Sequence, residues 1–189
     1  MQIPKRTVRL APLCLALSLA AFGTADAATR PDFYAVFNPA AGQLPFPTNL
    51  LFSGSTDGTL NIPVADPTNL ADPKVAMNQL DGFSTVAPMT AYFSGALNPT
   101  TVKAGSTVRV FEVTLTQSFA VAEVKGELKA GTDYSANLLP QDANRTTLNI
   151  HPLLPLKPKT GYLVVLTNGI QDSGGFDASP SPTYALTKL

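Results

Sequence analysis

Two short segments carry a hydroxyl residue between or beside glycines, where a hydrolytic nucleophile would be sought. A serine hydrolase holds its nucleophile on a Gly-x-Ser-x-Gly turn, because the sharp bend exposes the hydroxyl beside an oxyanion hole. Residues 82–86 (GFSTV) place Ser84 at the centre but lack the second glycine, and residues 54–58 (GSTDG) place Thr56 there. Neither segment matches the motif.

A serine nucleophile also needs a general base, and the only histidine is His151, directly before Pro152. We expect His151 to be a surface or packed residue at a strand end, because no catalytic partner is recognisable. The only cysteine, Cys14, lies in a segment that we expect to be removed. We therefore assign no catalytic residue, and whether the chain is an enzyme stays open, with a small esterase of unrecognised type as the minor alternative.

Several aspartates supply oxygens of the kind that calcium binds. They lie in residues 172–177 (DSGGFD) and at Asp57, Asp66 and Asp72, but neither group has the ligand spacing and closing Glu of a calcium loop. One histidine and no mature cysteine exclude the usual zinc sites. We expect these carboxylates to form turns, and we assign no metal and no cofactor.

Two further patterns are compatible with binding or modification. Residues 144–146 (NRT) match the glycosylation sequon, which a turn between strands explains equally well. Without tryptophan, a sugar-stacking surface would need Tyr34, Tyr92 or Tyr184. We expect each tyrosine to pack in the core or at a strand end.

Residues 1–27 have the three parts of a secretory signal peptide. Three basic residues precede an apolar run over residues 10–22, and Ala25-Asp26-Ala27 predicts cleavage after Ala27. The run is shorter than the roughly 20 residues of a membrane span. Leu13 stands where a small residue should precede a lipid-modified cysteine, so Cys14 is not expected to be lipidated. We predict a secreted, periplasmic or cell-envelope protein without a stable membrane span.

The charge balance excludes two classes of partner. Removing residues 1–27 takes away three of the 13 basic and one of the 13 acidic residues, which leaves 10 against 12 and a formal charge of −2. No basic surface is expected for nucleic acid or anionic lipid. The mature chain also has no disulfide framework, so its stability must come from packing. Its oligomeric state is left open.

Residues 87–189 are predicted to form an immunoglobulin-like (Ig-like) β-sandwich, because frequent proline and glycine exclude long helices. Residues 147–151 and 133–138 alternate apolar and polar side chains, as half-buried strands do. Residues 107–113 and 162–166 are apolar on both faces, which favours positions in the middle of a two-layer structure. The predicted fold is all-β.

Residues 28–86 are predicted to be an ordered, loop-rich segment that wraps the sandwich. Their large apolar side chains would be costly to leave in water. One short helix is expected over residues 73–80, because Asp72 can cap it, Pro73 suits the first helical position and Gly82 follows its end. Residues 28–189 would then form one domain.

A weak internal similarity links residues 128–134 (LKAGTDY) to residues 156–162 (LKPKTGY). A turn followed by a tyrosine that opens a strand is the pattern of a tyrosine corner, in which the phenol oxygen bonds to the upstream backbone. We attribute the similarity to shared turn chemistry and not to a duplicated module.

Several motifs in the same order make the chain resemble the N-terminal domain of bacterial virulence-factor extracellular lipases. The resemblance covers approximately residues 37–189. The motifs are residues 43–52 (QLPFPTNLLF), 57–63 (DGTLNIP), 80–85 (LDGFST), 105–111 (GSTVRVF) and 155–170 (PLKPKTGYLVVLTNGI). The C-terminal half alone also resembles the Ig-like domains of bacterial surface-layer proteins.

The resemblance implies a domain that precedes an α/β-hydrolase domain in its family. The sequence ends where that hydrolase domain would begin, so no family catalytic residue has a position here. We expect an exported, non-catalytic scaffold or positioning module whose partner is a hydrolase domain. The alternative is a stand-alone Ig-like binding or adhesive protein with a partner in the cell envelope.

Overall fold

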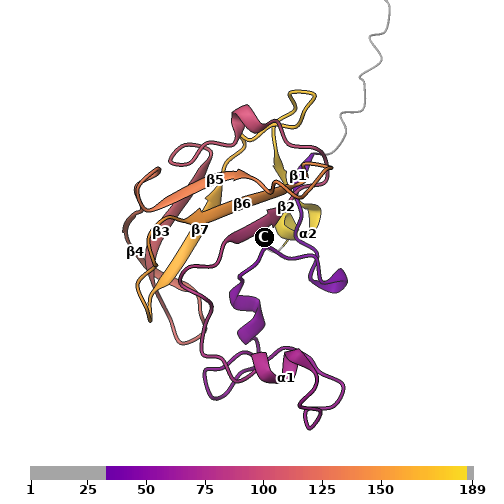
Figure 1. The fold of residues 1–189 in the computed structure, drawn as a ribbon, viewed down its shortest axis with the longest axis vertical. Helices are drawn as coiled ribbons and strands as arrows, with labels where there is room; N and C mark the ends of the chain where they lie inside the picture. Colours follow the sequence, from indigo (N-terminus) through magenta and orange to yellow (C-terminus); the bar gives the residue numbers. More distant parts are fainter. Residues whose placement is uncertain (1–32, 187–189) are drawn as a thin grey trace, which may run out of the picture. The chain divides into compact units, whose positions relative to one another are not determined.

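The computed structural model describes residues 33–186, which lie in one compact unit, Pro31–Leu189. Eight strands and two short α-helices occur there, joined by loops and three 3₁₀ helices (Figure 1). The strands are β1 (Tyr34–Ala35), β2 (Met89–Tyr92), β3 (Val108–Leu115), β4 (Val121–Glu127), β5 (Tyr134–Leu138), β6 (Thr147–Pro152), β7 (Gly161–Leu166) and β8 (Ser179–Pro180). The helices are η1 (Pro39–Ala41), η2 (Asn49–Phe52), α1 (Pro73–Met77), η3 (Pro99–Thr101) and α2 (Pro182–Leu186).

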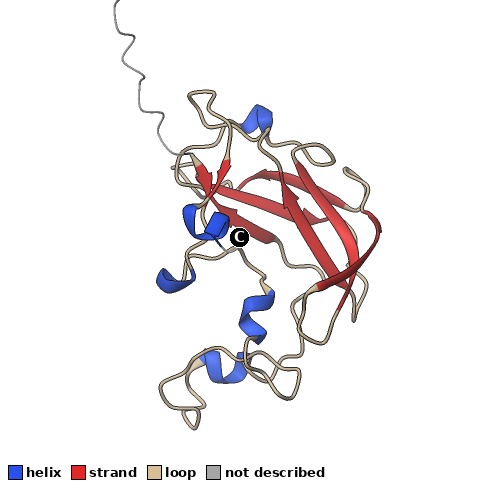
Figure 2. Ribbon diagram, turned by 180° about the vertical axis from the view of Figure 1, so that it is seen from behind, coloured by secondary structure: helices blue, strands red, loops and turns tan. Residues whose placement is uncertain are grey.

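Two antiparallel three-stranded sheets form the body of the domain, with strand orders β2-β6-β5 and β4-β3-β7. Figure 2 shows the long strands gathered together, with most of the loop-rich chain outside them. The sheets pack on each other through one apolar core, to which both contribute. Its fully buried members include Val108, Val110, Tyr134, Leu148 and Ile150. The all-β sandwich expected from the sequence is confirmed.

The alternating strands bury the residues that the sequence pattern predicts. In β6, Leu148 and Ile150 are buried while His151 is exposed. The middle position expected for residues 107–113 is also found, since β3 lies between β4 and β7. β7 differs, because it lies at the edge of its sheet with all six residues half-buried. Its outer residues, Leu163 and Val165, lie beside Phe111 and Arg109 of β3, which accounts for an edge strand that is apolar on both faces.

The opposite edge strand, β4, is exposed at all seven residues. Its register with β3 shifts twice, which leaves Ala122 and Lys125 without directly opposed partners. Such bulges and charged side chains keep an edge strand from pairing with other chains. β4 therefore closes the sheet without contributing to the core.

The loop-rich segment before β2 is held to the sandwich by backbone hydrogen bonds. Val36 N donates to Tyr92 O, and Phe46 exchanges two hydrogen bonds with Thr90 of β2. The β1 strand pairs with β8, where Tyr34 lies opposite Ser179. These contacts extend the edge of the β2-β6-β5 sheet and tie it to both ends of the described chain.

Helix α1 begins as the sequence predicts, with Pro73 at its first turn and the Asp72 carboxylate accepting from Lys74 N. It ends at Met77 and not near residue 80. The Asn78 side chain accepts from Ile62 N and donates to Ile62 O, and this distant pairing holds the chain after the first helical turn. A second short helix, α2, was not expected from the sequence. The Ser181 hydroxyl accepts from Tyr184 N at its start.

Both tyrosines of the internal similarity bond to upstream backbone, but in different ways. The Tyr162 hydroxyl accepts from Lys157 N at 2.9 Å, five residues earlier, as in a local tyrosine corner. The Tyr134 hydroxyl instead reaches the turn before β3, where it accepts from Gly105 N and donates to Val108 O. Tyr134 therefore links two connections that are distant in sequence.

The turn before β3 is a further copy of the turn before β5. In the first, Gly105 N donates to Val108 O, and in the second, Gly131 N donates to Tyr134 O. Both glycines have positive φ angles, and Lys159 takes a φ of 54° at the matching position before β7. Three strands of the sandwich thus start from related turns, in agreement with shared turn chemistry.

Candidate functional site

Ser84 and His151, the two side chains considered as a nucleophile and its base, are not hydrogen-bonded to each other in the described residues. The Ser84 Oγ accepts hydrogen bonds from Val86 N at 3.3 Å and Ala87 N at 3.1 Å, which makes it a turn-forming residue. His151 lies exposed on β6, opposite Ser135 of β5. In the part of the chain that the structure describes, no hydrogen bond connects Ser84 to His151.

The aspartates considered as calcium ligands accept hydrogen bonds within their own turns. Asp57 accepts from Thr59 and Ser55, and Asp66 accepts from Thr68. In each case these hydrogen bonds hold the pKa of the carboxyl below its usual value, chiefly through Thr59 N for Asp57 and the Thr68 hydroxyl for Asp66. The other candidate carboxylates also accept hydrogen bonds: Asp72 caps α1, Asp172 Oδ1 accepts from Gly174 N and Phe176 N, and Asp177 Oδ1 accepts from Gln171 Nε2.

A further carboxylate, Asp142, organises the connection between β5 and β6. Its Oδ2 accepts from Thr146 N, from the Thr146 hydroxyl and from the Thr147 hydroxyl, at 2.8 to 3.0 Å, and its Oδ1 accepts from Asn144 N. These donors, led by the Thr147 hydroxyl, lower the pKa of Asp142 to about 2. The sequon falls in this turn, where Arg145 has a φ of 56°.

Replacing Asp142 with asparagine is expected to lower the stability at pH 7, because an amide nitrogen cannot accept the hydroxyl donors. A lowered folded-state pKa contributes stability above the unfolded-state value near 3.8, and this contribution is lost as the pH falls through about 2. The difference between wild type and Asp142→Asn in urea midpoint should therefore narrow from pH 4 to pH 2. An equal difference at both pH values would contradict this account. Asp81→Asn, at an exposed residue, is the control.

An apolar hollow of about 150 Å³ lies in the loop-rich segment. Its walls are mostly hydrocarbon and come from residues on both sides of α1. They are Phe46, Pro47, Leu60, Met77, Leu80, Gly82, Phe83, Ser84, Ala87 and Pro88. The sequence did not predict this hollow because its walls are spread over more than 40 positions. The only local signal is the presence of apolar residues on either side of α1.

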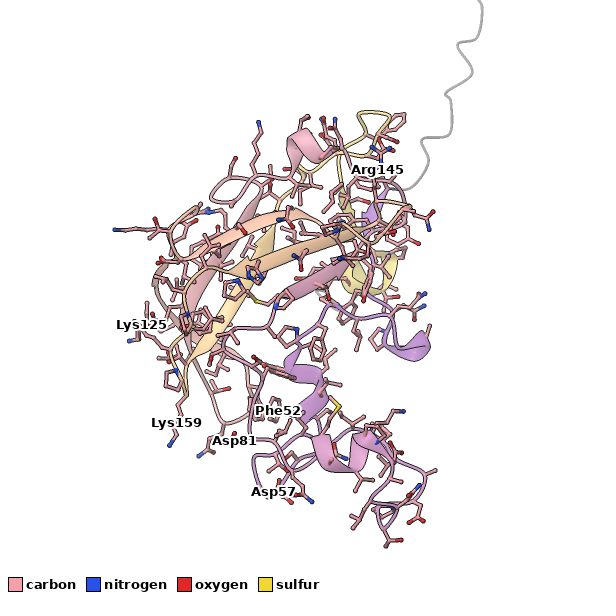
Figure 3. The ribbon with its side chains drawn as sticks, in the orientation of Figure 1. Phe52, Asp57, Asp81, Lys125, Arg145 and Lys159 are labelled. Carbon is pink, nitrogen blue, oxygen red and sulfur yellow. The ribbon has the colours of Figure 1, made fainter. Side chains whose placement is uncertain are left out.

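Four phenylalanines beside this hollow form a connected cluster. Phe83 makes edge-to-face contacts with Phe46 at 5.6 Å and with Phe52 at 5.7 Å between ring centroids. Phe52 also stacks on Phe119, which lies at the tip of the β3–β4 hairpin, at 4.5 Å. Asn49 Nδ2 donates to Phe119 O at the same contact. Figure 3 shows Phe52 between the sandwich and the part of the loop-rich segment that carries Asp57. The cluster therefore fastens the loop-rich segment to the hairpin.

The three tyrosines considered for sugar binding do not form one surface element. Tyr34 is half-buried in β1, Tyr92 ends β2, and Tyr184 lies in α2. The Tyr184 ring packs edge-on against Phe37 at 5.7 Å. Tyr34 and Tyr92 thus lie at strand ends as expected, whereas the expectation was wrong for Tyr184, which lies in a helix and is 43% exposed.

None of the helices within residues 33–186 is long and apolar enough to span a bilayer. Within the same residues, acidic, histidine and cysteine side chains do not gather in groups of three or more that could hold a metal ion.

Comparison with known proteins identifies a family for almost the whole chain. The family model described as bacterial virulence factor lipase N-terminal matches residues 20–189. No curated protein and no solved structure gives a significant match. The match agrees with the resemblance carried by the motifs between residues 43 and 170. The chain belongs to the family of bacterial virulence factor lipase N-terminal domains.

Proposed function

We propose that this chain is an exported, non-catalytic domain that acts as a scaffold or positioning module for an α/β-hydrolase domain of the lipase type. The observation that carries the proposal is the family match, which extends over residues 20–189 and names the N-terminal part of a lipase. A fold alone does not define a function, since a sandwich serves many roles. The family match supports a role for this sandwich beside an ester-hydrolysing partner.

The contacts of Ser84 and His151 support a non-catalytic role. Ser84 Oγ accepts from two backbone amides of its own turn, and His151 lies exposed on a different element. A nucleophile and its base must lie within hydrogen-bond reach of each other. The packed core offers instead a rigid body on which a second domain could be oriented.

We also propose the export route and the domain boundaries that the sequence predicts. Residues 1–27 act as the export signal and lie outside the described residues. The mature chain, residues 28–189, acts as one domain outside the cytoplasm, in which residues 28–86 wrap the sandwich of residues 87–189. The hydrogen bonds from Val36 and Phe46 to β2 and the Phe52–Phe119 stack support the wrapping.

A scaffold should stabilise the hydrolase domain that it holds. We expect the chain to co-elute with a hydrolase domain of a lipase from this family, expressed without its own N-terminal domain, and to raise the Tm of that domain. When the chain is present at 100 times the Kd of the complex, the free energy of unfolding of the hydrolase domain should rise by about 2.7 kcal/mol. An α/β-hydrolase from another family should neither bind nor be stabilised. An unchanged Tm and separate elution would contradict the scaffold role.

A further inference from the structure

The apolar hollow opens on a surface with several exposed apolar side chains. We propose that this surface, the docking face, is where the hydrolase domain binds, and that the hollow receives one large apolar side chain of that domain. The docking face consists of the hollow and of Phe46, Leu80, Val86 and Leu154. This assignment rests on the proposed scaffold role and adds to it the part of the domain that makes the contact.

The rim of the hollow carries large apolar side chains that water still reaches. Phe46 and Leu80 line the hollow and are 42% and 50% exposed. Val86, which is 56% exposed, directly precedes the wall residue Ala87. A hydrogen bond from Leu156 N to the carbonyl of residue 85 brings the segment with the exposed Leu154 to the same rim. Exposed apolar residues that gather in this way, and are not scattered singly, mark interaction sites.

The outer faces of the two sheets are more polar than the docking face. On the β4-β3-β7 sheet, Arg109 pairs with Glu127 and covers the Phe111 ring at 4.8 Å from its centroid. On the β2-β6-β5 sheet, Asn149 and His151 alternate with the buried residues of β6. Burying such groups costs free energy unless the partner supplies matching hydrogen bonds. The docking face carries no such cost at the hollow, whose walls are mostly hydrocarbon.

Helix α2 lies along the same edge of the sandwich as the hollow. Phe46, at the hollow, pairs with Thr90 of β2, and Val36 bonds to β2 two residues further along the strand, a distance of about 7 Å. Phe37, which follows Val36, packs against Tyr184 of α2, and Figure 1 shows α2 beside β2. The family is that of lipase N-terminal domains, so in its lipases the hydrolase domain comes after this domain in the chain, on the side of α2.

The size of the hollow fits one side chain of the partner. In another protein, a dry cavity of about 150 Å³ holds benzene, so a phenylalanine or leucine side chain matches the volume of this hollow. A stable interface buries about 800 Å² on each partner, so the rim must supply the rest of the contact. Binding energy is concentrated where a large side chain fills such a pocket. The hollow is therefore the centre of the docking face.

The charge of the loop-rich segment favours a protein over an anionic membrane as the occupant of this face. Between residues 33 and 86 the charged residues are four aspartates and one lysine, a net charge of −3. Asp81 directly follows Leu80 at the rim and is exposed. An anionic lipid surface would be repelled by this charge. A protein can instead place a basic side chain beside its apolar anchor, opposite Asp81.

The test introduces a charge at the rim and measures the Kd of the exported full chain for a hydrolase domain of a lipase from this family by calorimetry. Leu80→Glu and Val86→Glu should each raise the Kd at least about ten-fold, because an unpaired charge in the contact is costly. Val124→Glu is the matched control and should leave the Kd unchanged. Val124 is 52% exposed and lies on β4, outside the docking face.

The outcomes distinguish the docking face from the scaffold role. If the wild-type chain binds, and both rim variants bind as tightly as Val124→Glu, the scaffold role stands and the docking face is wrong. If the wild-type chain does not bind, the scaffold role fails and the docking face with it. The chain alone should elute as a monomer. A dimer that dissociates in Leu80→Glu would assign the face to a second copy and would also overturn the proposal.

Discussion

Replacing Tyr134 with alanine is expected to lower the free energy of unfolding by about 3–5 kcal/mol, the usual cost of removing a large buried aromatic side chain. The Tyr134 side chain is fully buried, and its ring packs in the core between the two sheets. A domain of this size is stabilised by only about 5–15 kcal/mol. Tyr134→Ala should therefore unfold at a much lower urea concentration than wild type, measured by circular dichroism.

The hydroxyl of Tyr134 can be tested separately with Tyr134→Phe. This change removes two hydrogen bonds at a buried site, those to Gly105 N and Val108 O, although Gly105 N still donates to Val108 O. At about 0.5–1.5 kcal/mol for each hydrogen bond, it should cost about 1–3 kcal/mol. Tyr162→Phe is the matched control, because the half-buried Tyr162 accepts only from Lys157 N and should cost about 0.5–1.5 kcal/mol. A cost for Tyr162→Phe that equals or exceeds that for Tyr134→Phe would contradict the linking role of Tyr134.

Replacing Phe52 with alanine is expected to release the loop-rich segment, with a loss of about 3 kcal/mol in the stability of that region. Phe52 is 5% exposed and contacts both Phe83 and Phe119. Losing these ring contacts should raise the rate of proteolytic cleavage in residues 53–72.

The sandwich should respond differently from the segment in Phe52→Ala. Local opening requires less free energy than global unfolding, so the fragment that contains β2 to β7 should stay resistant to protease. Leu50→Ala, at a more exposed residue of the same 3₁₀ helix, is the control and should leave the cleavage rate near wild type. Wild-type resistance in Phe52→Ala would show that the ring cluster does not hold the segment.

The sequence allowed prediction of those elements whose signals are local. The alternation in residues 147–151 located β6, and Asp72 with Pro73 located the start of α1. The end of α1 was wrong because Asn78 is held by Ile62, a contact that no local signal reveals. β4 was missed because its apolar residues Val121, Ala122 and Val124 do not alternate regularly with polar ones.

The candidate sites also divide into those that local sequence predicts and those that depend on packing between distant residues. The turn role of Asp57 and Asp66 follows from the residues around them, whereas the hollow depends on packing between residues 46 and 88. The reach of Tyr134 to Gly105, 29 residues away, likewise requires the two sheets to be assembled. The resemblance to a lipase N-terminal domain was available from the sequence because its motifs lie in short continuous segments, and the family match confirms it.

The proposed scaffold role implies that the domain does not itself hydrolyse esters. The most direct measurement is the rate at which the purified, exported chain alone hydrolyses p-nitrophenyl butyrate, compared with Ser84→Ala and His151→Ala. The account predicts that all three proteins give the rate of the buffer blank. Hydrolysis above the blank that disappears in either variant would contradict it.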